Sequence, residues 1–235
     1  MKIIKPSYEI INIEKINGIA ILKDIEKVGR TCYKSEENIT EESASKFVDM
    51  IIKRGHEAMI EHNSISVRFI CDRGVSHELV RHRLASFAQE STRYCNYSKD
   101  KFENEITVIK PCWLNETPNE LLQLRNSRHP CHKNMGSFNW VSAMQECENR
   151  YLTLLKLGWA PQEARSVLPN SLKTEIVMTM NLREWRHFFK LRCDNAAHPQ
   201  MRELILPLLC EMSDLIPVVF DDLFTQFLDT MLLYD

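Results

Sequence analysis

The stretch Arg81–Tyr94 reads RHRLASFAQESTRY, in which three arginines and one histidine accompany a single acidic residue, Glu90. An arginine guanidinium is a planar group of donors that binds phosphate through two hydrogen bonds, and histidine titrates near neutral pH. Ordinary charged surfaces instead mix lysine with glutamate. The stretch therefore indicates a site for a phosphate-bearing ligand, with an exposed helix face or an internal salt-bridge cluster as the alternatives.

The composition shows that this basic stretch is a local feature. The chain has 235 residues, of which 44% are hydrophobic, and a formal net charge of −2. This content is sufficient for a buried core, and the near-neutral charge suits a small anionic ligand better than a nucleic-acid duplex. The six glycines form neither a G-x-G-x-x-G motif nor a Walker motif. We therefore expect side chains to bind the phosphate.

Cysteine usage and hydropathy predict a soluble cytoplasmic protein. The eight cysteines are irregularly spaced and nothing resembles a signal peptide, so we expect reduced thiols. The cluster His129-Pro130-Cys131-His132 lacks the second half of a closed zinc site, and we expect no metal. No segment approaches the roughly 20 apolar residues that a membrane span needs. We expect neither a membrane nor a nucleic acid as partner.

The segments before the basic stretch are typical of a helix and a strand. Phe47 and Ile51 fall at helical spacing before Gly55, which predicts a helix that ends just ahead of His56. Residues 64–71 alternate between apolar and polar side chains, which indicates a strand. This pattern would bring His56 to a helix end.

The basic stretch itself is predicted to begin on a helix and to continue in a loop. Residues 75–83 fit a short helix with Val75, Leu79 and His82 facing inward. The polar run that follows, up to Thr92, is typical of a loop. The cationic side chains would then lie on both sides of a helix end.

An irregular segment separates this region from the next helices. Residues 111–136 contain three prolines and no clear period, and we assign no element to them. Residues 137–157 carry apolar side chains at helical spacing and are followed by Gly158, which predicts a long helix. Pro161 suits the first turn of a short helix that would contain Arg165.

A second strand leads into an amphipathic helix. Residues 172–180 alternate and predict a strand that ends at Asn181, where Glu184 three positions later is typical of a helix start. The apolar stripe that begins at Trp185 ends with Arg192. A guanidinium there needs a buried carboxylate or a ligand as partner, although an apolar stem with its head in solvent is also open.

The order of elements predicts the fold class. From about His198 the sequence is largely apolar helix, interrupted by Pro207 and Pro217. There are no internal repeats, linkers or low-complexity tracts. We expect one α+β domain over residues 1–235, with a mixed or antiparallel sheet flanked by long helices.

Several blocks of the sequence together resemble one enzyme family. The stretch Arg81–Tyr94 resembles the signature of the flavin-dependent thymidylate synthases, the ThyX family. The resemblance extends over about residues 30–205. Its further blocks are Gly55-His56-Glu57, Glu61-His62, Ala164–Pro169, Asn181-Leu182-Arg183 and Leu191–Asp194.

The resemblance implies a binding role for specific positions. The implied FAD contacts are His56, Arg81, His82, Arg83, Gln89, Asn181, Arg183 and His187. The implied dUMP contacts are Glu78, Arg81, Gln89, Glu90, Ser91, Thr92, Arg93, Arg165 and Arg192. His62 is interpreted as a core histidine.

The resemblance also implies the reaction. It is the FAD-dependent reductive methylation of dUMP to dTMP, with methylenetetrahydrofolate as carbon donor and NADPH as reductant, in a homotetramer whose sites are shared between subunits. Arg192 is the expected catalytic residue, because a fixed cation can stabilise charge at N3 and O2 of the uracil ring. Ser91 is interpreted as a binding hydroxyl, because serine is a poor nucleophile without a positioned base. Cys193 is interpreted as a small buried hydrophobe.

Two hypotheses compete with this interpretation. One is a nucleotide- or RNA-binding protein without chemistry, and the other is a flavoenzyme that acts on a related pyrimidine nucleotide. The chain also departs from the family, since Ala88 and Gln89 stand where members commonly carry Asn and Glu. This departure removes a negative charge and a hydrogen-bonding group near the expected ligands.

Overall fold

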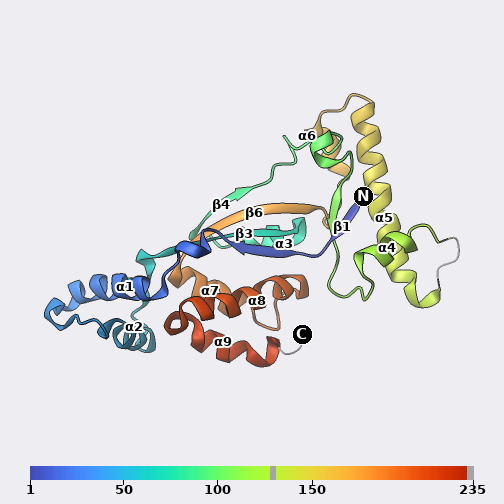
Figure 1. The fold of residues 1–235 in the computed structure, drawn as a ribbon. Coiled ribbons are helices and arrows are strands. Elements are labelled where there is room, and N and C mark those ends of the chain that lie inside the picture. The colour runs from blue at the N-terminus through green and yellow to red at the C-terminus, as the bar shows by residue number, and fades with distance from the viewer. Residues whose placement is uncertain (128–130, 232–235) are drawn as a thin grey trace. The chain divides into compact units, whose positions relative to one another are not determined.

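Short strands and longer helices alternate along the chain (Figure 1). The computed structural model describes residues 1–127 and 131–231. The strands are β1 (Lys2–Ile4), β2 (Ser7–Ile10), β3 (Ser64–Asp72), β4 (Ala85–Gln89), β5 (Thr107–Ile109) and β6 (Lys173–Asn181). The helices are α1 (Gly18–Tyr33), α2 (Ser43–Lys53), α3 (Arg73–Leu79), α4 (Pro118–Leu124), α5 (Met135–Lys156), α6 (Pro161–Ala164), α7 (Leu182–Arg192), α8 (Pro199–Leu215) and α9 (Pro217–Met231). The predicted α+β class is confirmed.

The central strands are the two that the alternation predicts. The four-stranded sheet has the order β2-β3-β6-β4, so β3 and β6 each have two neighbours. Burial alternates along β6, where Thr174, Ile176 and Met178 are buried and the residues between them are half-buried. A second, two-stranded sheet pairs β1 with β5 in parallel.

The segment after the short helix was predicted wrongly as a loop. Residues 85–89 form β4, which lies beside β6 at one end of the strand order. An edge strand pairs on one side only, and its side chains do not need the apolar alternation by which buried strands are found. The preceding helix is also shorter than predicted, because α3 ends at Leu79.

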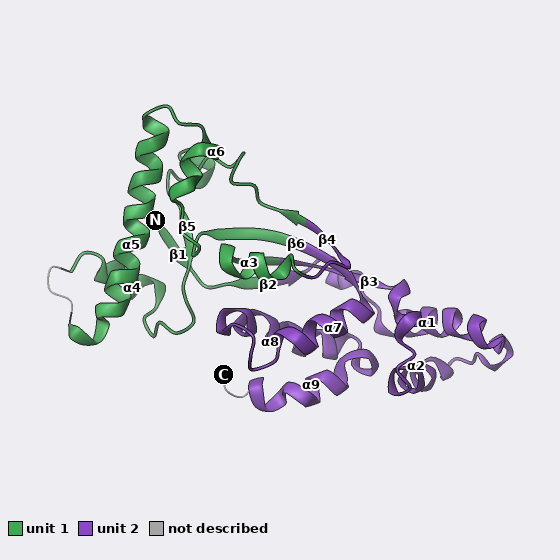
Figure 2. Cartoon of the chain, turned by 180° about the vertical axis from the view of Figure 1, so that it is seen from behind, with its two compact units in different colours: residues 1–7, 69–81, 88–176 green, residues 8–68, 82–87, 177–235 purple. Residues whose placement is uncertain are grey.

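The chain divides into two compact units (Figure 2). Unit 1 comprises residues 1–7, 69–81 and 88–176, and unit 2 comprises residues 8–68, 82–87 and 177–235. Residues of β3, β4 and β6 are divided between the units. The single domain over residues 1–235 stays a prediction.

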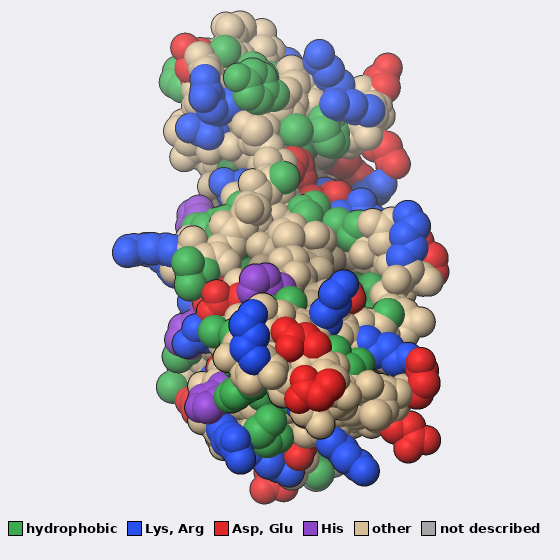
Figure 3. Space-filling view, turned by 90° about the vertical axis from the view of Figure 1, so that its left-hand side faces the viewer, with side chains coloured by type: hydrophobic (Ala, Val, Ile, Leu, Met, Phe, Trp, Pro, Cys, Tyr) green, Lys and Arg blue, Asp and Glu red, His purple; other side chains and the backbone are tan. Residues whose placement is uncertain are grey.

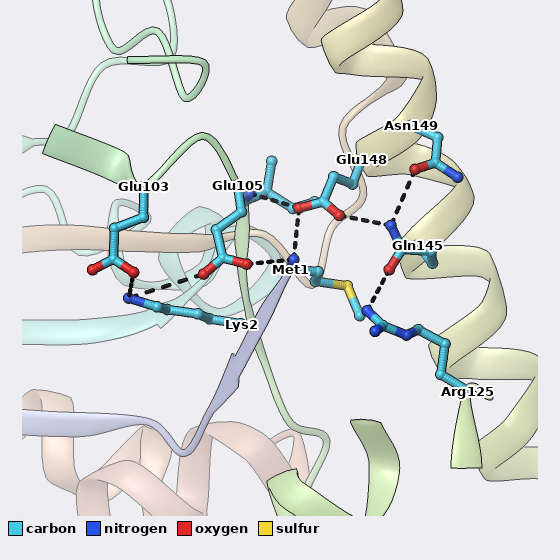
Figure 4. Close-up of polar contacts among 9 residues, drawn as sticks. Met1, Lys2, Glu103, Glu105, Arg125, Gln145, Glu148 and Asn149 are labelled. Atoms are coloured by element: carbon cyan, nitrogen blue, oxygen red, sulfur yellow. Dashed lines mark hydrogen bonds and ion pairs between the residues drawn. The ribbon is translucent and has the colours of Figure 1, made fainter. Parts of the chain in front are cut away.

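Unit 1 has an apolar core beside a polar network. Ile106, Val108 and Tyr151 are fully buried in one cluster. Figure 4 shows Glu148 of α5 at the centre of the polar contacts, where its carboxylate lies 2.9 Å from the Met1 amino group and accepts a 3.0 Å bond from the Ile106 N–H. Helix α5 thereby contacts the residues that directly precede the two strands of the small sheet.

The segment predicted as irregular contains a helix. Thr117 caps α4, because its side chain accepts a bond from the Glu120 N–H while the Glu120 carboxylate accepts one from the Thr117 N–H. This capping box satisfies two terminal donors and is a known helix start. Pro118, the first residue of α4, therefore marks a helix start within residues 111–136. His129 and Pro130 lie outside the described residues.

Aromatic packing on α7 organises unit 2. Trp185, Phe188 and Phe189 are fully buried, and Phe189 meets Phe220 of α9 edge-on at 5.7 Å. The buried Arg186 makes two 2.7 Å bonds to Asp222, which compensate for the cost of burying its charge.

Two prolines near the C-terminal end act differently. Pro207 lies inside α8, so the interruption predicted there is wrong, whereas Pro217 is the first residue of α9. At the first helical position proline loses no hydrogen bond, because that N–H has no intrahelical partner. Among the helices of the described residues, none is long and apolar enough to cross a membrane.

Candidate active site

The residues implied as ligand contacts separate between the two units. Unit 1 contains most of the expected dUMP contacts, and unit 2 contains most of the expected FAD contacts together with Arg192. The expected contacts in unit 1 are Glu78, Arg81, Gln89, Glu90, Ser91, Thr92, Arg93 and Arg165. Those in unit 2 are His56, His82, Arg83, Asn181, Arg183, His187 and Arg192.

In unit 1, the loop after β4 is built by backbone hydrogen bonds. The Glu90 N–H donates to the Glu175 carbonyl on β6 at 2.8 Å, and the N–H groups of Tyr94 and Cys95 both donate to the Ser91 carbonyl. The Ser91 hydroxyl accepts a 3.3 Å bond from the Arg93 N–H. The hydroxyl thus contacts its own loop, and its role as a binding hydroxyl stays a prediction.

Two expected contacts of this loop meet in space. The Arg165 guanidinium donates to the Thr92 hydroxyl at 3.2 Å, although 73 positions separate them. Arg165 follows α6 at the start of a short 3₁₀ turn, which confirms its predicted place at a short helix. Arg93 is exposed and lies over the Tyr94 ring at 5.5 Å. The loop therefore presents guanidinium groups beside two hydroxyls, which suits a phosphate.

The carboxylate of Glu90 is engaged within unit 1. It accepts a 2.9 Å bond from the Tyr97 hydroxyl and pairs with the Lys173 ammonium at 3.0 Å. Burial lowers the pKa of Lys173, but its bonds to Glu175 and Glu90 outweigh this effect and raise it overall. Burial and the neighbouring Glu90 raise the pKa of Tyr97. Both partners therefore stay protonated at neutral pH.

Gln89, which stands where family members commonly carry Glu, contacts neutral hydroxyl groups. Gln89 donates from its amide to the Ser76 hydroxyl at 3.0 Å and to the Thr174 hydroxyl at 3.3 Å. Arg73 also donates to Thr174, at 3.3 Å. Sequence reasoning did not find these supporting residues; the one signal for them was Thr174, a polar residue on the buried side of β6.

In unit 2, a pocket of about 450 Å³ brings three expected FAD contacts together. They are Asn181, Arg183 and His187, and Arg183 pairs with Glu61 at 2.5 Å. The Asn181 side chain accepts a 2.8 Å bond from the Glu184 N–H and caps α7, which confirms the predicted helix start. Arg183, His187 and Lys190 are candidate donors to a phosphate-bearing cofactor, while Glu57, Glu61 and Glu184 line the same pocket and give it mixed charge.

Two histidines near this pocket are exposed. His56 follows the end of α2, as predicted, and its Nδ1 lies 2.8 Å from the Tyr33 hydroxyl. Gly55 adopts φ +72°, a left-handed conformation that suits glycine after a helix end. His62 is exposed, so its interpretation as a core histidine is wrong. It lies on a short 3₁₀ helix, Glu57–His62, whose turn directs it outward.

His82 and Arg192 form the polar centre of unit 2. Arg192 donates from Nε to His82 Nε2 at 3.0 Å, while His82 Nδ1 lies 3.5 Å from a Glu184 carboxylate oxygen. His82 is 5% exposed, as its predicted inward direction requires. Burial, Arg192 and His187 lower its pKa to about 4. Arg81 and Arg83 on either side of it are exposed.

Cys193 follows Arg192 but takes no part in this polar centre. It is fully buried, and burial raises the pKa of its thiol. A buried neutral thiol is a poor nucleophile, because the thiolate is the reactive form. Cys193 is therefore a small apolar core residue, as predicted.

Comparison with known proteins identifies the family of this chain. The family model described as "Thymidylate synthase complementing protein" matches residues 20–218. A flavin-dependent thymidylate synthase from Geobacter sulfurreducens is 32% identical over 200 residues, covering 82% of this chain and 78% of the relative. One from Corynebacterium efficiens is 35% identical over 205 residues, with 84% and 78% covered.

Solved structures show the same fold at lower identity. Thymidylate Synthase X from Helicobacter pylori, solved with FAD and dUMP, has a TM-score of 0.65 and 24% identity over 86% of this chain and 94% of that one. A UMP/dUMP methylase, PolB, from Streptomyces cacaoi has a TM-score of 0.70 and 19% identity, with 97% of both chains covered. With two curated relatives above 30% identity and a family model that matches most of the sequence, this chain belongs to the flavin-dependent thymidylate synthase family.

Proposed function

We propose that this protein converts dUMP to dTMP by FAD-dependent reductive methylation, with methylenetetrahydrofolate as carbon donor and NADPH as reductant. The observation that supports the proposal is that residues marked by the family pattern meet within each unit: Arg165 contacts Thr92 in unit 1, and Asn181, Arg183 and His187 line one pocket in unit 2. When bound, FAD supplies the redox chemistry. The chain's own residues bind and orient the substrates.

For dUMP, the proposed roles follow the chemistry of each side chain. Arg93 and Arg165 bind the phosphate, supported by the Ser91 and Thr92 hydroxyls. Glu78 and Arg81 complete the substrate site, together with Gln89. The Glu90 carboxylate is held by Lys173 and Tyr97, so we assign Glu90 to the support of the loop. Arg192 stabilises negative charge that develops on the pyrimidine ring.

For FAD, the proposed contacts are the residues of the unit 2 pocket and their neighbours. Arg183 supplies a cation, and Asn181 and His187 supply polar groups on the same pocket wall. His56, Arg83, Arg81 and Gln89 are proposed contacts from the family pattern. The homotetramer with shared sites and the cytoplasmic location stay predictions, as do the folate and NADPH sites.

The competing hypothesis of an RNA-binding protein has less support. On the face shown in Figure 3, basic and acidic side chains are interspersed. An RNA-binding surface usually concentrates positive charge in a stripe or patch. The basic groups that the family pattern marks are instead divided between the two units, and in unit 1 Arg165 contacts the Thr92 hydroxyl.

Visible absorption spectroscopy tests the proposal. We expect the purified protein to bind FAD, to show the flavin bands and to lose them when NADPH is added without oxygen. Protein that stays colourless after reconstitution with FAD would overturn the assignment. Product analysis with dUMP and UMP in parallel then determines the nucleotide, and we expect dTMP from dUMP as the main product.

A further inference from the structure

One imidazole lies between the two ends of helix α7. Glu184 and Arg192 are eight positions apart on this helix, and both approach the same ring, His82. Phe188 stands midway between them on the same face. We propose that His82 is a positioning residue that fixes the orientation of the Arg192 guanidinium, with Glu184 holding the other side of the ring. This proposal rests on the catalytic role that the proposed function gives to Arg192.

The hydrogen bond determines which ring nitrogen carries the proton. Arginine has only donors, so the 3.0 Å contact requires an unprotonated Nε2 on His82. In a neutral ring the proton then lies on Nδ1, which faces the Glu184 carboxylate at 3.5 Å. A carboxylate beside the N–H of a histidine is the usual way in which a protein fixes one tautomer.

Packing fixes the plane of the ring. The Phe188 ring meets His82 edge-on with centroids 4.8 Å apart, and His187 lies at 6.3 Å. The titratable and charged groups that face His82 are Arg192, His187 and Glu184, all on α7. The ring is therefore held by one helix whose last residue is the arginine that it orients.

Burial separates this role from that of a flavin contact. The family pattern implies that His82 contacts FAD, but 5% exposure leaves little of the ring for a ligand. Arg83 beside it is exposed, and Asn181, Arg183 and His187 line the open pocket. The ring instead contacts Arg192, which is half-buried at the surface of unit 2.

Substitutions of His82 test the assignment through a split between turnover and binding. In His82→Gln the amide oxygen replaces Nε2 as acceptor, whereas His82→Leu removes the acceptor and retains an apolar side chain. We expect His82→Leu to lower kcat on the order of 100-fold, because a misplaced catalytic group costs that much. The dissociation constant for FAD should change less than about threefold, and His82→Gln should recover most of kcat.

Two controls make the outcome decisive. His132→Gln, at an exposed histidine of unit 1, should behave like the wild type. A His82→Leu protein with wild-type kcat at saturating FAD but weakened FAD binding would overturn the proposal in favour of a flavin contact. An equal loss of kcat in His82→Gln and His82→Leu would also overturn the proposal.

A measurement without turnover keeps the proposal testable if His82→Leu does not fold. Nitrogen NMR of ¹⁵N-histidine-labelled wild-type protein, assigned with His82→Gln, reports the tautomer at pH 7. We expect a proton on Nδ1 and none on Nε2. The opposite tautomer or a charged ring would overturn the proposal. Absence of dTMP formation by the wild type would instead refute the proposed function, and the NMR result would still decide the His82–Arg192 contact.

Discussion

At the scale of single residues, charge pairing around Glu90 sets the properties of the substrate loop. Lys173 is the cation that neutralises this carboxylate, and Tyr97 donates a further hydrogen bond. Removing Lys173 would leave an unpaired negative charge near the site proposed for a phosphate. Such a charge opposes anion binding and costs more when the group is partly buried.

We therefore expect Lys173→Met to weaken dUMP binding roughly tenfold, about 1.4 kcal/mol, measured by calorimetric titration. Adding Glu90→Gln to Lys173→Met should restore part of the affinity, because the charge of Glu90 is then gone while Glu175, the other partner of Lys173, keeps its charge. Lys156→Met, at an exposed lysine that ends α5, is the matched control. An additive loss in the double variant would show that Lys173 acts through packing alone.

The lowered pKa of His82 predicts a pH dependence of stability. Because its pKa falls from an ordinary value of about 6.5 to about 4, the unfolded chain binds more protons than the folded chain between these values. The stabilisation is fully present above about pH 6.5 and is lost as the pH falls towards 4. Urea unfolding should show roughly 3 kcal/mol less stability from this group at the acidic end.

The same experiment on His82→Gln isolates the contribution of the ring. This variant has no titrating group at the position, so its free energy of unfolding should change less between pH 7 and pH 5 than that of the wild type. Equal pH dependence in the two proteins would contradict the assignment of a buried neutral histidine. The other titrating groups contribute equally to both proteins, so they cancel in the difference between the two free energies of unfolding.

At the scale of elements, helix α7 connects a cap at its start with Arg192, the proposed catalytic residue, at its end. Asn181 is both the N-cap of this helix and a proposed FAD contact. Asn181→Ala should lower the free energy of unfolding by about 1 kcal/mol, whereas Asn181→Asp should keep the cap and most of the stability.

The two substitutions separate the cap from ligand binding. Asn181→Asp places a negative charge in the pocket proposed for a phosphate-bearing cofactor, so FAD should bind more weakly than to the wild type despite the intact cap. Denaturant unfolding and fluorescence titration with FAD measure the two effects. If FAD bound to Asn181→Asp as well as to the wild type, Asn181 would be a cap only.

Elements of the fold differ in how far the sequence predicts them. The sequence predicts β3, β6, α5 and α7, because apolar residues recur in them with the period of a strand or a helix. Strand β4 was not predicted, because pairing with β6 makes it a strand and its residues, Ala-Ser-Phe-Ala-Gln, show no strict alternation of apolar and polar side chains. The helix α4 was missed because its prolines were interpreted as breaks.

The candidate site shows the same division. The local motifs predicted the site residues of the family pattern. The contacts that hold those residues in place join positions far apart in the sequence. Lys173 and Glu90 are 83 positions apart, and Arg192 and His82 are 110 apart. Such pairs depend on the tertiary fold, and no local spacing contains them.

At the scale of the whole molecule, the proposed homotetramer with shared sites predicts linkage between assembly and cofactor binding. Anything that binds the assembled form alone shifts the equilibrium towards it. Dilution should therefore dissociate the tetramer and release flavin. Sedimentation velocity at the flavin absorption wavelength measures the oligomeric state and the bound flavin in one experiment. A monomer that keeps FAD and full activity at low concentration would contradict shared sites.

The most direct test of the central claim is the formation of dTMP by the purified protein. The assay contains dUMP, methylenetetrahydrofolate and NADPH, with and without FAD, and mass spectrometry quantifies the product. We expect dTMP only with FAD, and we expect Arg192→Ala to lose turnover while it retains bound flavin, because its charge acts on the pyrimidine. Flavin-loaded wild-type protein that forms no dTMP, or an Arg192→Ala protein that turns over normally, would contradict the account.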